Sequence, residues 1–355
     1  MSEKVITSYK AFDKNMKCRG FQYEVGKEYE MDGEAKCCNQ GFHACKFPME
    51  VWDYYDMLVS RYAEVEQSGK IDAEENSTKV CSSRIKIKAE LKLADIINIG
   101  VEWLKDITSP SEVKADGVLN DNGDRRKQIG SSGNSAKIGS SGDCAKIGSS
   151  GYSAQIGSSG DCAKIGSSGE CAQIGSSGYY AKIGSSGYCA KIGSSGECAQ
   201  IGSSGNSAQI GSSGDWAQIG SSGNSAQIGS SGYSAKIGSS GYSAQIGSSG
   251  NYAQIGSSGD CAKIGSSGDC AKIGSSGNYA KIDSTGEDSV IMCAGNSSIA
   301  KAKVGSWITL AEWKWSDEKK CDVPVCVKTE YVDGENIKAD IWYQLKNGKF
   351  VEVNE

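Results

Sequence analysis

One histidine and three cysteines near the N-terminus are the residues best suited to bind a metal ion. His43 is the only histidine, and it lies in the segment Cys37-Cys38-Asn-Gln-Gly-Phe-His43-Ala-Cys45. Cys18, Cys38, His43 and Cys45 together offer three thiolates and one imidazole, a set that can hold zinc tetrahedrally. Because the sequence contains no Cys-x-x-Cys pair, a packed histidine among buried thiols is the alternative interpretation.

A second candidate site lies in the segment Arg61-Tyr-Ala-Glu-Val-Glu66. The alternation of this segment predicts a strand, so Glu64 and Glu66 would point to the same face. A carboxylate beside a cleft can act as a general acid or base. The alternative interpretation is a solvated strand face without catalytic function.

A nonapeptide repeat separates the regions that flank it. Isoleucine recurs every nine residues from Ile129 to Ile282, in the pattern Ile-Gly-Ser-Ser-Gly-x-x-Ala-Lys/Gln. Ala and Ile stand two residues apart, so a strand would point both of them to one face. Gly-Ser-Ser-Gly favours a bend, because glycine adopts unusual backbone angles and serine bonds the local backbone. One strand and one bend per unit predict a β-solenoid, and two glycines in every nine residues exclude a helix.

The aromatic residues of the array favour a coil of two repeat units, about 18 residues, over a coil of three units. Tyr180, Trp216 and Tyr252 each precede an Ala and are spaced by 36 residues. A two-unit coil places all three on one face, whereas a three-unit coil scatters them. Exposed Tyr and Trp are typical of interaction surfaces, so we expect these three residues to form a binding strip. Random filling of a permissive position is the alternative.

Composition excludes several functions for the array. The residue after the second Gly is acidic in only seven of seventeen units, which argues against calcium sites shared between turns. Thr is absent from residues 128–282, and a flat outward array of Thr is what ice binding usually requires. The net charge of this region is +2, which fits neither an acidic mimic of DNA nor a phosphate-binding stripe.

Both flanks of the array have the patterns of folded domains that cap its ends. Residues 1–110 are expected to form an α+β domain, with strands over 20–29, 61–67 and 80–88, a short helix after Pro48 and a helix over 91–107. Residues 111–127 are polar and are expected to be a linker, followed by the solenoid over 128–291. Residues 292–355 are expected to form a small β domain, with strands over 307–313, 323–331, 341–345 and 349–353 and turns at Asp333-Gly334 and Asn347-Gly348. The predicted fold class is therefore mainly β.

The flanks resemble an uncharacterised protein family. The resemblance is carried by Cys18-Arg-Gly-Phe-Gln-Tyr-Glu-Val-Gly-Lys-Glu-Tyr29, Gly41-Phe-His-Ala-Cys45 and Arg61–Glu66, and in the tail by Gly305-Ser-Trp307, Leu310-Ala-Glu312 and Ile341-Trp-Tyr343. Members of this family occur in bacteriophages and gut-type Firmicutes and join this N-terminal domain to Gly-rich repeats. The resemblance implies this architecture and a phage or prophage origin, but no activity.

The N-terminal domain is also similar, more faintly, to ADP-ribosyltransferase folds. The similarity lies in Gly41-Phe-His43-Ala followed by a helix and a strand that carries Glu. In such folds a Gly-aromatic strand precedes a helix beneath the NAD site, and a later strand carries the catalytic Glu. This similarity implies NAD as a cofactor, with His43 and either Glu64 or Glu66 as site residues. No paired Tyr motif accompanies them.

The leading functional hypothesis is a non-enzymatic, elongated scaffold that binds a host protein, another copy of itself or a small ligand. One alternative is an ADP-ribosyltransferase-like enzyme with the solenoid as a spacer, and another is a self-assembling structural protein. Fifteen cysteines without an apolar leader indicate a reducing compartment, so we expect a cytoplasmic protein without nucleic-acid or membrane partners. Homo-oligomers remain compatible with the sequence.

Overall fold

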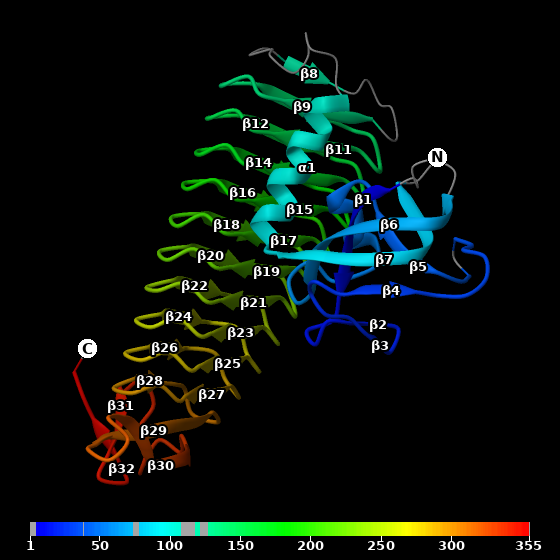
Figure 1. Ribbon diagram of the computed structural model, residues 1–355. Coiled ribbons are helices and arrows are strands. Elements are labelled where there is room, and N and C mark those ends of the chain that lie inside the picture. Colours follow the sequence, from blue (N-terminus) through cyan, green and yellow to red (C-terminus); the bar gives the residue numbers. More distant parts are fainter. Residues whose placement is uncertain (1–4, 38, 74–77, 108–117, 121–126, 355) are drawn as a thin grey trace.

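The computed structural model describes residues 5–37, 39–73, 78–107, 118–120 and 127–354. A β-solenoid forms the long axis of the molecule, an N-terminal domain packs against one of its sides, and a β cap covers its C-terminal end (Figure 1). The mainly β fold predicted from the sequence is confirmed, with about ten turns between residues 128 and 310.

Each nonapeptide of the solenoid contributes one four-residue strand, and consecutive strands belong to two different parallel sheets. Ile138 pairs with Ile156 in one sheet, and Ile147 pairs with Ile165 in the other. One coil therefore consists of two repeat units, or about 18 residues per turn. This is the coil that the spacing of Tyr180, Trp216 and Tyr252 predicts.

We name the two sheets by the numbers of their solenoid strands. The even-strand sheet contains β8 (Val118–Asn120), β10 (Lys137–Ser140), β12 (Gln155–Ser158), β14 (Gln173–Ser176), β16 (Lys191–Ser194), β18 (Gln209–Ser212), β20 (Gln227–Ser230), β22 (Gln245–Ser248), β24 (Lys263–Ser266), β26 (Lys281–Ser284), β28 (Ile299–Lys301) and the antiparallel strands β31 (Tyr343–Lys346) and β32 (Lys349–Glu352). The odd-strand sheet contains β9 (Gln128–Ser131), β11 (Lys146–Ser149), β13 (Lys164–Ser167), β15 (Lys182–Ser185), β17 (Gln200–Ser203), β19 (Gln218–Ser221), β21 (Lys236–Ser239), β23 (Gln254–Ser257), β25 (Lys272–Ser275), β27 (Val290–Cys293), β29 (Trp307–Ser316) and the antiparallel strand β30 (Cys321–Tyr331).

The interior of the solenoid is narrow and built from small residues. Ile and Ala of every described unit are buried, together with the first Ser of the repeat. The second Gly stacks directly on the same residue of the preceding coil, so that a β-carbon at Gly160 would lie 2.0 Å from the carbonyl oxygen of Gly142. No side chain fits in that space, which explains why the second Gly is kept throughout the array.

The coil extends beyond the residues that show the sequence repeat. Ile291, Cys293, Ile308 and Leu310 are buried and continue the inward column after the Gly and Ser pattern has ended. Before the array, β8 pairs in parallel with β10 inside the segment expected to be a linker. Residues 111–117 and 121–126 of that segment lie outside the described residues.

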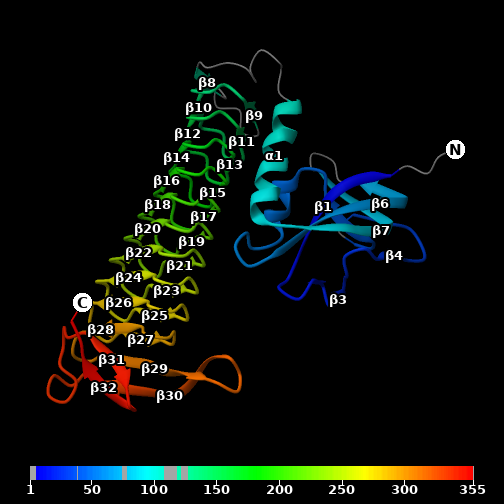
Figure 2. The same ribbon diagram turned by 60° about the vertical axis from the view of Figure 1, so that its left-hand side comes forward.

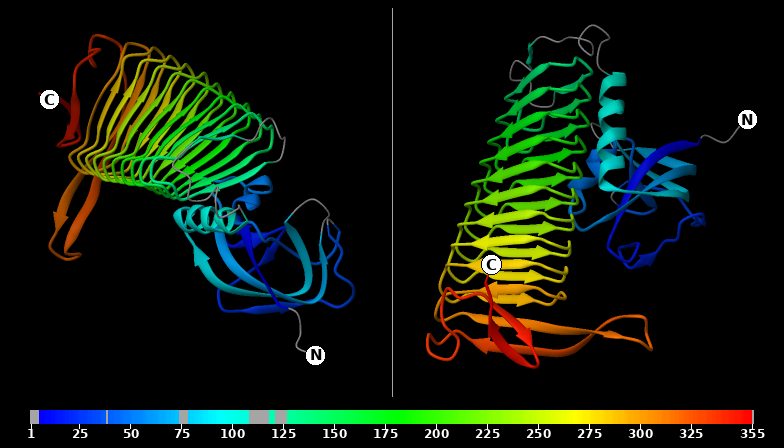
Figure 3. Two further views of the ribbon diagram at one scale, coloured as in Figure 1. Left: turned by 90° about the horizontal axis from the view of Figure 1, so that it is seen from above. Right: turned by 90° about the vertical axis from the view of Figure 1, so that its left-hand side faces the viewer.

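The C-terminal cap turns the last coil into antiparallel structure. β30 pairs with β29, and β31 pairs with both β28 and β32. Buried Val332, Tyr343 and Leu345 extend the apolar interior of the solenoid into the cap. The β29–β30 hairpin projects beyond the side of the solenoid (Figure 3). All four strands expected here are present, and Asn347-Gly348 forms the predicted turn with both residues at positive φ.

The N-terminal domain is a small β-barrel. Its strands are β1 (Ile6–Phe12), β4 (Glu28–Glu30), β5 (Phe42–Cys45), β6 (Arg61–Ala73) and β7 (Lys79–Leu91), with a hairpin formed by β2 (Lys17–Cys18) and β3 (Phe21–Gln22). β7 pairs with β6 along one edge and with β5 and β4 along the other, while β1 pairs with β6 and β5. These pairings close the ring β7–β5–β1–β6.

Two helices lie at the interface between this barrel and the solenoid. The 3-10 helix η1 (Pro48–Asp53) and the α-helix α1 (Leu93–Ile107) agree with the two helices expected from the sequence. α1 lies along the odd-strand sheet, between that sheet and the barrel (Figure 2). Within the described residues, no helix is both long and apolar enough to cross a membrane.

Candidate functional site

The first Gly of each repeat faces outward, and on the odd-strand sheet α1 packs on those from Gly130 to Gly202. A β-carbon at Gly130 would lie 2.5 Å from the backbone of Leu104, and one at Gly184 would lie 2.8 Å from Ile97. Ile96, Ile97, Val101 and Leu104 of α1 are completely buried. The absence of side chains at these glycines therefore lets the apolar face of the helix approach the strands closely.

Lysines beside this glycine stripe pair with acidic residues of η1. Lys146 Nζ lies 3.3 Å from Glu50 Oε2, and Lys164 Nζ lies 2.5 Å from Asp53 Oδ2. Glu50 is almost completely buried and also accepts a 2.5 Å hydrogen bond from Thr78 Oγ1. Lys182 Nζ donates to the carbonyl oxygen of Trp52. The Lys positions of the repeat thus fix the N-terminal domain to the odd-strand sheet.

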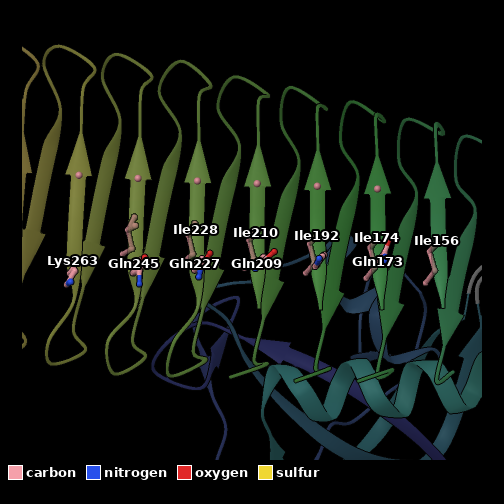
Figure 4. A pocket seen from close by; sticks show the side chains of 18 of the residues that line it. Ile156, Gln173, Ile174, Ile192, Gln209, Ile210, Gln227, Ile228, Gln245 and Lys263 are labelled. Atoms are coloured by element: carbon pink, nitrogen blue, oxygen red, sulfur yellow. The ribbon is translucent and has the colours of Figure 1, made fainter. Parts of the chain in front are cut away.

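The outer face of the even-strand sheet has the same pattern without a covering helix. Seven of its glycines, from Gly157 to Gly265, have no heavy atom within 4 Å of the position that a β-carbon would occupy. A groove of about 1310 Å³ follows this stripe and reaches Asp283 and Trp342 at the cap. Figure 4 shows Gln173, Gln209, Gln227, Gln245 and Lys263 in one row across successive strands of this face.

The lysines along this groove differ from those of the opposite sheet in their partners. Lys137, Lys191 and Lys263 are exposed, and none of their ammonium groups makes an ion pair or a hydrogen bond with a residue that the structure describes. The described residues that line the groove include one acidic side chain, Asp283, and this residue pairs with Lys301 at 3.0 Å. The groove therefore carries positive charge that the chain itself does not neutralise.

The predicted aromatic strip lies on one edge of the solenoid. Tyr180, Trp216 and Tyr252 are 53%, 51% and 49% exposed, and all occupy the turn that leads from an even strand to the next odd strand. Each follows a groove glycine by five residues, as Tyr180 follows Gly175. The ring of Tyr179 packs 4.4 Å from that of Tyr180, and Tyr233 packs 5.2 Å from Tyr252. The strip thus lies at the C-terminal ends of the even strands, which are also the ends nearer to the glycine stripe.

The barrel contains a second cavity, of about 650 Å³, which brings together three residues of the predicted metal site. Cys18, His43 and Cys45 all line it, whereas Cys38 lies outside the described residues. Burial raises the pKa of Cys45 to about 12, which disfavours a thiolate there. Burial and the charges of Lys10 and Lys79 lower the pKa of His43. Among the described residues, no three His, Cys, Asp or Glu side chains are grouped as metal ligands.

The two predicted carboxylates lie apart from this cavity. Glu64 and Glu66 belong to β6 and are half-buried, and neither lines the cavity that contains His43. Glu66 forms an ion pair with Lys88 at 2.8 Å, and Glu64 lies opposite Tyr9 of β1. The structure therefore does not bring His43 together with either glutamate.

Several residues of these surfaces were not singled out from the sequence. Lys10 is buried in the barrel cavity, and Arg19 lies at the cavity's edge. Gly20, between two short extended segments, is a turn signal that could have directed attention to the neighbouring Arg19. No local signal marks Lys10, because its burial depends on strands that are distant in sequence.

Comparisons with known proteins assign one part of the chain. Residues 6–99 match the family model described as a domain of unknown function (DUF7666). This match covers the barrel and the first half of α1, and it agrees with the uncharacterised N-terminal domain expected from the sequence. No curated protein and no solved structure matches the chain.

Proposed function

We propose that this protein is a non-enzymatic, elongated binding scaffold whose even-strand sheet accepts a helix of another protein. The observation that supports the proposal is the difference between two chemically equivalent surfaces. Both sheets present a glycine stripe beside a row of Lys and Gln, and on the odd-strand sheet the part of the stripe from Gly130 to Gly202 is covered by α1, whereas Gly238, Gly256 and Gly274 are open. The equivalent groove on the even-strand sheet is open and fits a helix that packs in the same way.

The groove also indicates the chemistry of the partner helix. An apolar face like that of α1 would contact the glycine backbone and bury it from water. Acidic residues beside that face would pair with Lys137, Lys191 and Lys263, as Glu50 and Asp53 pair with lysines of the odd-strand sheet. We therefore expect an amphipathic acidic helix. A bacteriophage or prophage origin, implied by the family resemblance, would make the partner a host protein.

The aromatic strip adds a second contact region for the same partner. Tyr and Trp at half exposure supply a large apolar area together with a hydrogen-bonding group, and such residues dominate the binding energy of many interfaces. Tyr180, Trp216 and Tyr252 lie on one edge of the even-strand sheet. A chain segment that follows the helix could cross the strip from the groove.

The cap argues against the alternative of a self-assembling filament. β30 and β32 are antiparallel edge strands that carry three and two charged residues, and β30 also contains Pro324. Charges and proline on an edge strand oppose its pairing with another chain. The solenoid therefore does not present a bare coil at its C-terminal end.

A synthetic helix can test the proposal. The probe is a fluorescent peptide that carries Ile96, Ile97, Val101 and Leu104 at the spacing of α1, with Lys92 and Lys105 replaced by Glu. Fluorescence anisotropy should show saturable binding to the full chain. Because Gly193 and Gly211 have open space above them, a Gly193→Leu/Gly211→Leu variant should fold normally and bind at least tenfold more weakly.

A matched variant on the other sheet provides the control. Gly238 and Gly256 occupy the same repeat position on the uncovered part of the odd-strand sheet and also have open space above them. This part offers three open glycines and the even-strand stripe offers seven, so Gly238→Leu/Gly256→Leu should weaken peptide binding less than Gly193→Leu/Gly211→Leu does. Lys191→Glu should likewise weaken binding more than Lys236→Glu. The proposal is wrong if the peptide does not bind at 1 mM, or if the odd-sheet variants weaken binding and the even-sheet variants do not.

A further inference from the structure

The cavity of the N-terminal barrel lies at a place where the barrel wall is incomplete. β1 and β5 pair only through the bridge between Tyr9 and Cys45, so there is a gap in the pairing of these two strands. The ammonium of Lys10 occupies this gap and donates a 2.7 Å hydrogen bond to the carbonyl oxygen of His43. The cavity opens beside this ammonium, between β5, the β2–β3 hairpin and the residues that follow η1.

Lys10 is a buried cation without an acidic partner. Its side chain is 5% exposed, and no carboxylate among the described residues lies within ion-pair distance of it. The ammonium also lies 5.4 Å from the ring centre of Tyr23 and 5.7 Å from that of Phe12. A buried charge is strongly unfavourable unless it is paired. An anion that enters the cavity would supply the missing charge.

Arg19 provides a second cation at the edge of the cavity, and its backbone is strained. Arg19 and Gly20 form the two-residue turn between β2 and β3, with φ angles of +50° and +82°. Such a turn favours Asn or Gly at its first position, because other side chains at positive φ cost about 1 kcal/mol or more. Arg19 makes no ion pair or hydrogen bond with the described residues. Its guanidinium therefore lies at the cavity edge without a partner among the described residues.

Aromatic rings form much of the remaining wall. Phe21 and Tyr54 line the cavity and are 46% and 49% exposed. Phe21 packs edge-on against Tyr23 and Tyr29, with ring centres 4.8 and 5.3 Å apart. Rings held in this way can stack on or pack around a flat ligand.

The acidic residues of the cavity do not cancel its positive charge. Glu28 and Glu30 line one side, but both pair with Arg84, at 3.6 and 2.8 Å. The charges of Lys10 and Arg19 therefore remain available to a ligand. The volume of about 650 Å³ is within the usual range of small-molecule sites.

We propose that this cavity binds a small anion that carries a planar aromatic ring. The anionic group lies between Lys10 and Arg19, and the ring packs against Phe21 and Tyr54. The anionic group can be a phosphate or a carboxylate, because both accept hydrogen bonds from ammonium and guanidinium groups. This site is independent of the groove on the even-strand sheet.

The titration of Lys10 gives the expected dependence on pH. Burial lowers the pKa of Lys10, the charge of Arg19 lowers it further, and the interactions with Cys18 and Cys45 oppose this shift. The other titratable and charged side chains that line the cavity are those of Tyr9, Tyr23, Glu28, Tyr29, Glu30, His43, Tyr54, Tyr55 and Lys79. An anion binds the protonated form of Lys10, so affinity should decrease as pH rises through this lowered pKa.

Isothermal titration calorimetry on the full chain tests the proposal with two pairs of probes. The first pair is adenosine monophosphate and adenosine, and the second pair is 2-naphthoate and 2-naphthamide. In at least one pair the anion should bind at least tenfold more tightly than its neutral counterpart. The pair that shows this difference identifies the anionic group as a phosphate or a carboxylate.

Arg19→Gly is the decisive variant, because glycine suits the positive φ and the barrel should fold at least as well. Loss of one charged hydrogen bond should weaken the binding of the anion about tenfold or more. Lys14→Ala removes an equal charge from an exposed position outside the cavity and should leave the Kd unchanged. The proposal is overturned if neither anion binds at 5 mM, if anion and neutral probe bind equally in both pairs, or if Arg19→Gly has no effect.

Discussion

Ile97 of α1 occupies the space that a side chain at Gly184 would need, since a β-carbon there would lie 2.8 Å from its Cδ1 and Cγ1 atoms. Gly193 has the same place in the repeat on the other sheet, and nothing lies within 4 Å of its β-carbon position. One sequence pattern thus has two environments, a filled one beneath α1 and an open one on the even-strand sheet and on the uncovered part of the odd-strand sheet. Gly184 and Gly193 are therefore equivalent in the sequence repeat but differ in their surroundings in the folded protein.

The first prediction compares these two positions. Gly184→Ala should lower the free energy of unfolding by about 1–3 kcal/mol, because Ile97 must move in a well-packed interface. Gly193→Ala should be neutral or stabilising by about 0.5 kcal/mol, because alanine restricts the unfolded chain and meets no obstacle. Urea denaturation of both variants measures the difference. Equal effects would contradict the close packing of α1 on the odd-strand sheet.

The second prediction concerns the other glycine of the repeat. A β-carbon at Gly187 would lie 1.9 Å from the carbonyl oxygen of Gly169 in the preceding coil. Backbone cannot move aside as the end of a side chain can, so Gly187→Ala should destabilise the protein more than Gly184→Ala, by about 3 kcal/mol or more. Thermal unfolding followed by circular dichroism provides the test. A variant as stable as Gly193→Ala would show that neighbouring coils stack less closely.

The third prediction concerns the attachment of the N-terminal domain. Lys164 is buried against Asp53 of η1, whose side chain is 41% exposed. Lys164→Met keeps the apolar stem but leaves Asp53 without this partner, and partial exposure limits the loss to about 1–2 kcal/mol. Hydrogen exchange in α1 should become faster at the same time. Lys191→Met is the matched control on the even-strand sheet and should change stability by less than about 0.5 kcal/mol.

The periodicity of the solenoid was accessible from the sequence because it depends on neighbouring units alone. The recurrence of Ile and the regular spacing of Tyr180, Trp216 and Tyr252 were sufficient to predict a coil of two units. Which sheet α1 covers was not accessible, because both sheets carry the same residues. That choice depends on contacts such as the ion pair of Lys164 with Asp53, which are 111 residues apart in the chain.

The residues that line the barrel cavity could likewise be predicted only in part, because some are marked by their residue type and others depend on strand pairing. Cys18, His43 and Cys45 were identified as candidates from their residue types, and all three line the cavity. The cation that dominates the cavity, Lys10, was not identified, because Ser8, Lys10 and Phe12 alternate with Tyr9 and Ala11 without a clear apolar face. Pairing of β1 with β6, a strand distant in the sequence, determines which of these side chains point inward.

The fourth prediction concerns acid stability of the C-terminal cap. Asp333 Oδ1 accepts hydrogen bonds from the backbone N–H groups of Glu335, Asn336 and Ile337, at 2.9, 2.8 and 3.1 Å. The side chain of Asn336 and these N–H groups lower the pKa of Asp333 from 3.8 to about 2. The carboxylate therefore stabilises the folded cap above about pH 4, and this contribution is lost as pH falls towards 2.

Asp333→Asn isolates this contribution, because the amide oxygen can still accept from the backbone while the charge is removed. The wild-type protein should lose thermal stability between pH 4 and pH 2 more steeply than Asp333→Asn, since other carboxylates titrate equally in both. Asp333→Ala, which also lacks the acceptor, should be less stable than Asp333→Asn at pH 7. Melting temperatures measured at intervals from pH 2 to pH 7 give the comparison. Parallel curves for the wild-type protein and Asp333→Asn would show that Asp333 does not stabilise the turn through its charge.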